Sequence, residues 1–138
     1  ENEHYAERRI LRALDGIDLV PTGCERMMPD GSFRFGAQPE DLAEAQRGLE
    51  KAQAFIRDGL YDLVVLDEFL AAVAYDLLEQ SDVMDTVELW QQTRSCELVL
   101  SGHKVWDSLV LQADLVTEMR KVKHYYAKGV PARVGVEF

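Results

Sequence analysis

The stretch DLVVLDEFLAAVAYDLL, residues 62–78, contains the pattern that decides the predicted fold. A run of apolar residues ends at Asp67 and Glu68, and a segment that is apolar almost all round follows. A short continuous apolar run is typical of a strand buried on both faces, and the segment after it predicts a helix. Two adjacent acids therefore stand at the end of a predicted buried strand.

Asp67 and Glu68 have two interpretations. An acid at the end of a strand, as in a Walker B motif, can hold Mg²⁺ on a nucleoside triphosphate, because Mg²⁺ needs only one or two protein carboxylates. Alternatively, Asp67 only caps the following helix. The phosphate-binding motif GxxxxGK[ST] does not occur in the 138 residues, so the two acids alone leave both interpretations open.

The other segments continue an alternation of strand and helix. The clearest helix lies within residues 40–59, where apolar residues recur every three or four positions. Shorter helices are predicted within 3–14, 68–78 and 105–112, and another that Ser81 caps; strands are predicted at 17–23, 61–66, 96–102 and 113–119, and a long loop at 24–40. This order predicts one α/β domain over residues 1–138, with a mostly parallel sheet covered by helices.

In a parallel α/β sheet, ligands bind beyond the carboxyl ends of the strands. The residues after each predicted strand are therefore candidates for a binding site: 22–26, Asp67 and Glu68, 101–104, and 118–121. Among the three histidines, His103 is the best placed to contact a ligand. The alternative is a structural or solvated histidine.

The charge is unevenly distributed. The net charge of −10 argues against general nucleic-acid binding, yet residues 119–138 contain five Lys or Arg and one acid. This basic tail is either a solvated segment that offsets an acidic body or a segment that folds over an anionic ligand.

The sequence predicts neither a membrane-spanning segment nor a zinc site formed by cysteines. No apolar run reaches the roughly 18 residues of a membrane span, and no signal peptide is recognisable, so we expect a cytoplasmic protein. Cys24 and Cys96 form no CxxC pair, which predicts reduced cysteines and no zinc site.

The segments YDLVVLDE, LVLSG and ADLVTEMRKVKHYYAKGVPARVGVEF, in this order, closely resemble the P-loop-type ATP:corrinoid adenosyltransferases, the cob(I)yrinic acid a,c-diamide adenosyltransferase family. The resemblance covers about residues 40–138 and is weaker before them. It implies a P-loop-NTPase-like α/β fold. The family's first strand and phosphate loop have no counterpart in these residues, so relative to the family the domain is incomplete at its N-terminus.

The resemblance also implies the chemistry. In this family the Co(I) of a reduced corrinoid attacks the 5′ carbon of ATP and the triphosphate leaves, in adenosylcobalamin biosynthesis or salvage. Asp67 and Glu68 would then be catalytic residues that hold Mg²⁺, and Arg120, Lys123 and His124 of the basic tail would contact the nucleotide or the corrinoid. An external electron donor such as a flavoprotein, and a homodimer, are expected.

Further residues of the corrinoid or nucleotide site follow from the family's motifs. The family has a Gly-Phe-Thr-Trp-like loop after TG, whose aromatic side chains help cobalt to lose its lower ligand. Near this place the chain has Thr22, Gly23, Glu25 and Arg26, and later Phe33 and Phe35. The family's TGR is SGH here and its KAQ is PAR, so His103 and Arg133 either replace the lost polar contacts or mark a different ligand.

Two alternatives to the adenosyltransferase remain. One is a non-catalytic homologue that binds a corrinoid or a nucleotide. The other is a different P-loop-like nucleotide hydrolase whose N-terminal part is not in this sequence. The adenosyltransferase releases intact triphosphate, whereas the hydrolase releases ADP and phosphate.

Overall fold

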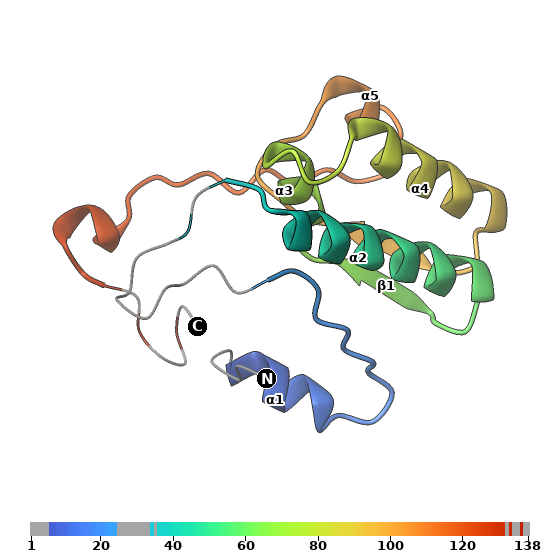
Figure 1. Cartoon of the computed structure of the whole chain (residues 1–138), viewed down its shortest axis with the longest axis horizontal. Helices are drawn as coiled ribbons and strands as arrows, with labels where there is room; N and C mark the ends of the chain where they lie inside the picture. Colours follow the sequence, from blue (N-terminus) through green and yellow to red (C-terminus); the bar gives the residue numbers. More distant parts are fainter. Residues whose placement is uncertain (1–5, 25–33, 35, 132, 134–135, 137–138) are drawn as a thin grey trace. The chain divides into compact units, whose positions relative to one another are not determined.

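The structure of the protein is a computed structural model, which describes residues 6–24, 34, 36–131, 133 and 136. The chain divides into two units: unit 1 comprises Glu1–Pro21 and Thr117–Phe138, and unit 2 comprises Thr22–Val116. Figure 1 shows the chain with its helices and strands labelled. The prediction that residues 1–138 form one domain stays a prediction.

The described residues of unit 2 form a two-stranded parallel sheet and four helices. In chain order the elements are α2 (Pro39–Asp58), β1 (Leu63–Leu66), α3 (Phe69–Ala74), α4 (Gln80–Thr93), β2 (Glu97–Leu100) and α5 (Asp107–Val110). Leu63 pairs with Glu97 at one end of the sheet and Leu66 pairs with Leu100 at the other. Parallel strands need a long crossover, and α3 and α4 supply it. The predicted α/β class and both of these strands are confirmed.

The longest helix, α2, begins and ends where its sequence predicts. Pro39 occupies the first turn, and the carboxylate of Asp41 accepts a hydrogen bond from the backbone N–H of Gln38 at 2.9 Å. Gly59 follows the last turn in the left-handed conformation, with φ of 64°. The sequence predicts that Leu42, Ala45, Leu49, Ala52 and Ile56 share one face of this helix, and of these Leu49, Ala52 and Ile56 are buried. Leu42, by contrast, is exposed.

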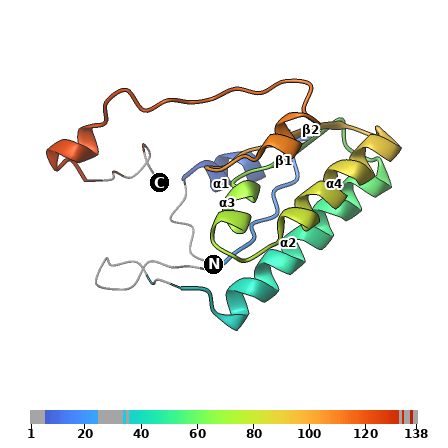
Figure 2. The same ribbon diagram turned by 90° about the horizontal axis from the view of Figure 1, so that it is seen from above.

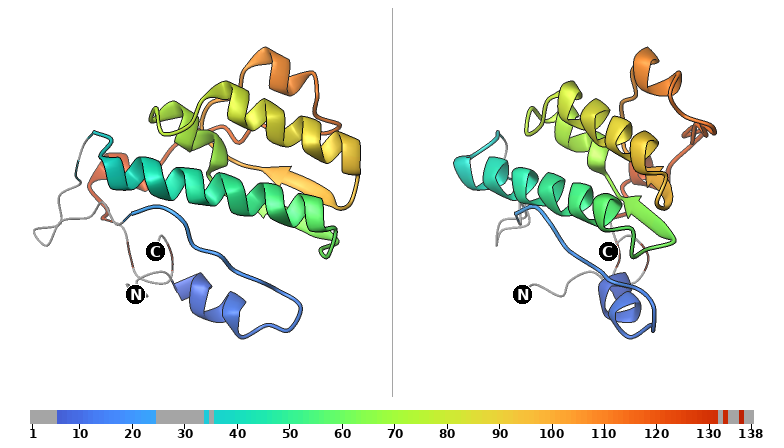
Figure 3. Two further views of the ribbon diagram at one scale, coloured as in Figure 1. Left: turned by 45° about the vertical axis from the view of Figure 1, so that its right-hand side comes forward. Right: turned by 90° about the vertical axis from the view of Figure 1, so that its right-hand side faces the viewer.

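The core of unit 2 lies between the helices and one face of the sheet. Figures 2 and 3 show α2 and α4 side by side, running in the same direction along the sheet. A cluster from α3, α4 and α5 adds to this core: Leu70, Val83, Val87 and Leu109. On the opposite face of the sheet, Leu63, Val65 and Val99 are each about half exposed. Within unit 2, helices therefore cover one face of the sheet, where the sequence predicts both.

The start of α4 differs from the prediction. Glu79, not Ser81, is the N-cap, because the carboxylate of Asp82 accepts the backbone N–H of Glu79 at 2.8 Å. Along the helix, Trp90 donates from Nε1 to the carbonyl of Cys96 at 2.7 Å. This bond ties the end of α4 to the residue before β2.

Two predicted strands, at 17–23 and 113–119, are wrong: the structure gives no strand at either place. A strand needs a neighbour to hydrogen-bond its backbone, and in the part of the chain that the structure describes the ladder consists of β1 and β2 alone. Apolar sequence is therefore not sufficient here. Leu115 and Met119 of the second segment are 85% and 92% exposed.

In unit 1, α1 (Ala6–Arg12) confirms the predicted N-terminal helix. The 3₁₀ turn η1 (Tyr125–Lys128) lies in the basic tail and ends at Gly129, whose φ is 81°. None of the helices built from the described residues has the length and apolar character needed to cross a lipid bilayer.

Candidate functional site

The carboxyl ends of β1 and β2 lie side by side, because Leu66 pairs with Leu100. The residues that follow the two strands, Asp67 and Ser101, are therefore neighbours, although 34 positions separate them in the sequence. This edge of the sheet is the position at which parallel α/β folds bind ligands. The predicted placement of Asp67 at a strand's carboxyl end is confirmed.

Ser101 makes four hydrogen bonds to the segment that runs from the last residue of β1 to the first turn of α3. Its Oγ donates to Oδ1 of Asp67 at 2.6 Å and accepts the backbone N–H of Glu68 at 2.8 Å. Its backbone N–H donates to the carbonyl of Leu66, and its own carbonyl accepts from the N–H of Leu70, each at 3.1 Å. The sequence singles out His103 in the segment 101–104, yet Ser101 holds the acid. A hydroxyl directly after the neighbouring strand is the signal that could have found it.

Glu68 adopts an unusual backbone conformation at this edge. Its φ is 53°, in the left-handed region that non-glycine residues seldom occupy. Its side chain is 57% exposed, and Oε2 lies 3.9 Å from Nε2 of His103, whose side chain is 81% exposed. The structure therefore brings His103 beside the second acid, at a distance that allows an ion pair when the imidazole is protonated.

Gly102 allows the two strand ends to approach closely. A Cβ at this position would lie 2.6 Å from Cβ of Leu70, and φ is 152°. A side chain there would collide with the first turn of α3. The absence of a side chain at Gly102 thus permits the backbone bond between Ser101 and Leu70.

The two carboxylates at this edge fit a metal ion whose other ligands are water and the phosphates of a substrate. Asp67 and Glu68 are both exposed, and among the described residues Ser101 is the hydrogen-bond donor to Asp67, through Oδ1. No cluster of three or more His, Cys, Asp or Glu side chains able to hold a metal ion occurs among these residues. Two carboxylates with open coordination positions match Mg²⁺ carried by a phosphate substrate, and do not match a closed structural site.

Thr22 and Gly23 lie against α2. A Cβ on Gly48 would lie 3.2 Å from the hydroxyl oxygen of Thr22, so the threonine packs closely on the helix. The backbone N–H of Gly23 bonds to Glu44. The hydrogen bond from Arg47 lowers the pKa of Glu44, and the bond from Gly23 lowers it further. Thr22 and Gly23 follow no strand here, in contrast to the prediction.

Asp41 binds residues on both sides of the segment 25–33. Its side chain is 2% exposed, and its two oxygens accept bonds of 2.8 and 2.9 Å from the guanidinium of Arg34. It also bonds to the thiol of Cys24. Burial raises the pKa of Cys24, and the charges of Asp41 and Glu44 raise it further. The bond with Asp41 raises the pKa of Arg34. Sequence reasoning missed this cluster, because nothing local links Arg34 to Asp41.

Four predicted residues of the aromatic loop, Glu25, Arg26, Phe33 and Phe35, lie outside the described residues. Cys24 and Cys96 are both half-buried and form no disulfide with each other, and their predicted reduced state stays a prediction.

The basic tail forms a small pocket in unit 1. Lys121, His124, Tyr126 and Ala127 line it. Nδ1 of His124 accepts the backbone N–H of Tyr126 at 3.1 Å, which leaves Nε2 as the nitrogen that carries the proton when the ring is neutral. The guanidinium carbon of Arg133 lies 5.1 Å from the centre of a tyrosine ring, that of Tyr125.

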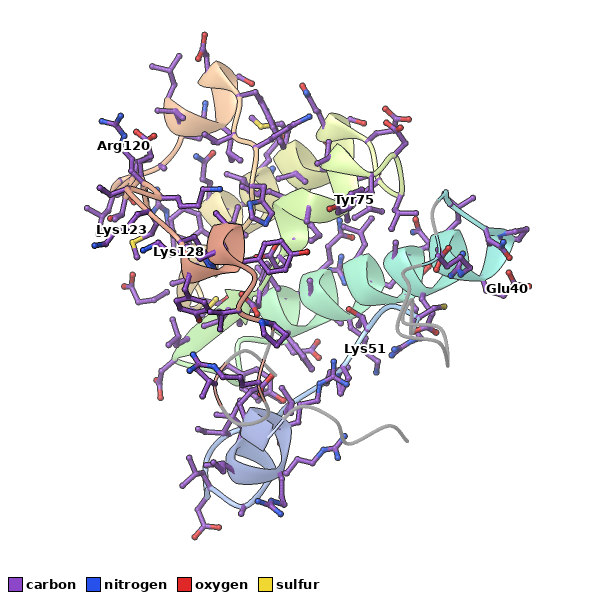
Figure 4. The ribbon with its side chains drawn as sticks, turned by 90° about the vertical axis from the view of Figure 1, so that its left-hand side faces the viewer. Glu40, Lys51, Tyr75, Arg120, Lys123 and Lys128 are labelled. Atoms are coloured by element: carbon purple, nitrogen blue, oxygen red, sulfur yellow. The ribbon has the colours of Figure 1, made fainter. Side chains whose placement is uncertain are left out.

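Arg120 and Lys123 lie in the same tail and are both exposed. Figure 4 shows their side chains projecting outward on one side of the tail. Neither lines the pocket, whereas His124 does.

Comparison with known proteins completes the description of the chain. Residues 1–138 match the family described as ATP:corrinoid adenosyltransferase BtuR/CobO/CobP. The chain is 37% identical over 98 residues to a corrinoid adenosyltransferase of Sinorhizobium sp, a match that covers 71% of this chain and 45% of the relative. It is 28% identical over 122 residues to a corrinoid adenosyltransferase of Escherichia coli (strain K12), covering 87% and 61%.

A third relative, the corrinoid adenosyltransferase CobA of Salmonella typhimurium, is 29% identical over 122 residues, with 87% of this chain and 61% of the relative covered. The chain thus spans roughly half of the length of these curated relatives.

Proposed function

The chain belongs to the ATP:corrinoid adenosyltransferase family, and we propose that the native protein transfers the adenosyl group of ATP to the cobalt of a reduced corrinoid. In this reaction the Co(I) substrate supplies an electron pair to the 5′ carbon of ATP. The cobalt–carbon bond forms, the bond from that carbon to the triphosphate oxygen breaks, and triphosphate leaves with the electron pair. The product serves adenosylcobalamin biosynthesis or salvage.

The observation that carries this proposal is the pair of carboxylates at the carboxyl end of β1. Asp67 is held by a 2.6 Å bond from Ser101, and Glu68 follows it with an exposed carboxylate. These two residues would hold Mg²⁺, which would neutralise charge on the leaving triphosphate. His103, beside Glu68, would bind a substrate phosphate or an amide of the corrinoid.

The basic tail supports a role in holding the anionic substrate. Arg120, Lys123 and Arg133 carry positive charge, and His124 lines the tail pocket, with Nδ1 accepting the backbone N–H of Tyr126. Cations near a triphosphate bind it in the ground state and stabilise the charge that develops as it leaves. We propose that a further group of residues contacts the corrinoid, and the only support is their position relative to the family's aromatic loop. They are Thr22, Gly23, Glu25, Arg26, Phe33 and Phe35.

The phosphate-binding loop is part of the proposal as well. The chain spans roughly half of its relatives, and the proposed reaction needs backbone donors around the triphosphate. We propose that polypeptide outside these 138 residues supplies a GxxxxGK[ST] loop. The coding sequence around this segment tests the point directly. A homodimer, a flavoprotein electron donor and a cytoplasmic location complete the proposal.

One product assay tests the function. The full-length protein is incubated with ATP, Mg²⁺ and chemically reduced cobalamin without oxygen, and the cobalt–carbon product and the released phosphates are measured. We expect adenosylcobalamin and intact triphosphate in equal amounts. ADP and phosphate alone would identify a nucleotide hydrolase. Binding of both substrates without turnover would identify a non-catalytic homologue.

A further inference from the structure

All three polar groups of Ser101, its hydroxyl, its backbone N–H and its carbonyl, form hydrogen bonds with the segment from Leu66 to Leu70, which contains the two acids. Its hydroxyl is at once a donor to Asp67 and an acceptor from the N–H of Glu68. Its backbone bonds to Leu66, the last residue of β1, and to Leu70, in the first turn of α3. The single residue after β2 therefore bonds to both ends of the connection between β1 and α3 and to the two acids within it.

The hydroxyl stabilises two features that would otherwise be free to change. The left-handed conformation of Glu68 costs about 1 kcal/mol or more, and the bond from its N–H to Ser101 offsets part of that cost. The Asp67 carboxylate is exposed, so without a fixed donor it would sample several rotamers. The carboxylate of Asp67 and the backbone of Glu68 are thus both held by a single oxygen atom.

The geometry points to Ser101 as a positioning residue that fixes Asp67 and Glu68 for a divalent cation carried by a triphosphate. This inference rests on the proposed function. A group that orients metal ligands contributes to affinity although it touches no metal, and its loss typically costs about 10–100-fold in metal affinity or activity. The role needs an atom that donates and accepts together, which Ser and Thr provide and Ala does not.

The test measures Mn²⁺ affinity by electron paramagnetic resonance in the presence of ATP, with kcat and KM for MgATP, on full-length wild type and variants. We expect Ser101→Ala to weaken Mn²⁺ affinity about 10-fold or more, and Ser101→Thr to stay close to wild type. Ser95→Ala is the matched control: its hydroxyl bonds to the carbonyl of Ile56, just before the opposite end of β2. It should lower thermal stability and leave Mn²⁺ affinity unchanged.

The outcomes separate this inference from the function on which it rests. If wild type binds Mn²⁺ with ATP and Ser101→Ala binds it equally well, the positioning role is wrong and the proposed function stands. If wild type neither binds Mn²⁺ with ATP nor forms product, both are wrong. Should Ser101→Ala not fold, Ser101→Cys replaces it, since a thiol keeps the shape but is a weak donor.

Discussion

Oγ of Ser101 lies 2.6 Å from Oδ1 of Asp67, and the two residues follow neighbouring parallel strands. The acid that the sequence places at the end of β1 is therefore held by the residue that directly follows β2. A change at either strand end should affect the same site.

Replacing Asp67 with Asn should lower Mg²⁺-dependent turnover by about 100-fold or more, because the side chain keeps its shape and its bond from Ser101 but loses the charge that holds the cation. Steady-state product formation and thermal unfolding would be measured together. Asp62→Asn, at the exposed start of β1, is the control and should behave as wild type. Glu68 is the N-cap of α3 and no side chain among the described residues caps this helix, so unchanged turnover in Asp67→Asn would mean that Asp67 has only a structural role, through its bond with Ser101.

Gly102→Ala should lower the free energy of unfolding by about 3 kcal/mol, because the new Cβ would meet Leu70 at 2.6 Å and the backbone would be strained. Gly59→Ala separates the two causes. Gly59 also has a positive φ, of 64°, but its nearest neighbour would be Cβ of Ser95 at 3.5 Å. We expect about 1 kcal/mol there, measured by denaturant unfolding. Equal losses in both variants would exclude close packing as the cause.

Asp41→Ala should cost about 2–4 kcal/mol of unfolding free energy, because it leaves the Arg34 guanidinium and the Gln38 N–H without their carboxylate. Arg47→Ala is the matched control. It breaks the more exposed pair with Glu44 on the same helix and should cost less than about 1 kcal/mol. Urea unfolding of both variants makes the comparison, and a cost for Asp41→Ala no larger than that of the control would contradict the prediction.

The reactivity of Cys24 should report the charge of Asp41. In a Cys96→Ser background, the rate of alkylation by iodoacetamide is followed against pH. Burial and the nearby carboxylates raise the pKa of Cys24, so the thiolate forms only at higher pH than usual. Asp41→Asn removes one of these charges, lowers the pKa and should speed alkylation at a fixed, mildly alkaline pH.

Glu40→Gln provides the control for that measurement, since it removes a charge from the same turn of α2 and Glu40 is not among the groups that shift the pKa of Cys24. Its alkylation profile should match that of the parent. A profile for Asp41→Asn that stays unchanged, or moves to higher pH, would show that Asp41 does not set the reactivity of this thiol.

The spacing of apolar residues and the capping residues correctly predicted α2, β1 and β2, whose packing in the structure follows that spacing. The apolar spacing of α2 and the capping groups at its start are present in the sequence, and β1 and β2 are short apolar runs with a turn on either side. The family was also predictable, since the segment from Ala113 to the end resembles the family's last motifs, and the whole chain matches its model.

The same segment shows where pattern reasoning stops. Residues 113–119 carry the sequence of a strand and of the family, yet they form none among the described residues, because a strand exists only with a partner. Ser81 likewise resembles a cap, but Asp82 makes the bond that starts α4 two residues earlier.

The sequence by itself determined the identity of the family, the order of α2, β1 and β2, and the presence of two acids after a buried strand, since each depends on residues that are close together in the chain. Only the tertiary structure decided that Ser101 holds Asp67, that His103 lies beside Glu68, and that Arg34 binds Asp41. These contacts depend on which strands pair and in what register. Apolar periodicity shows which face of an element is buried, but it does not specify the neighbouring element.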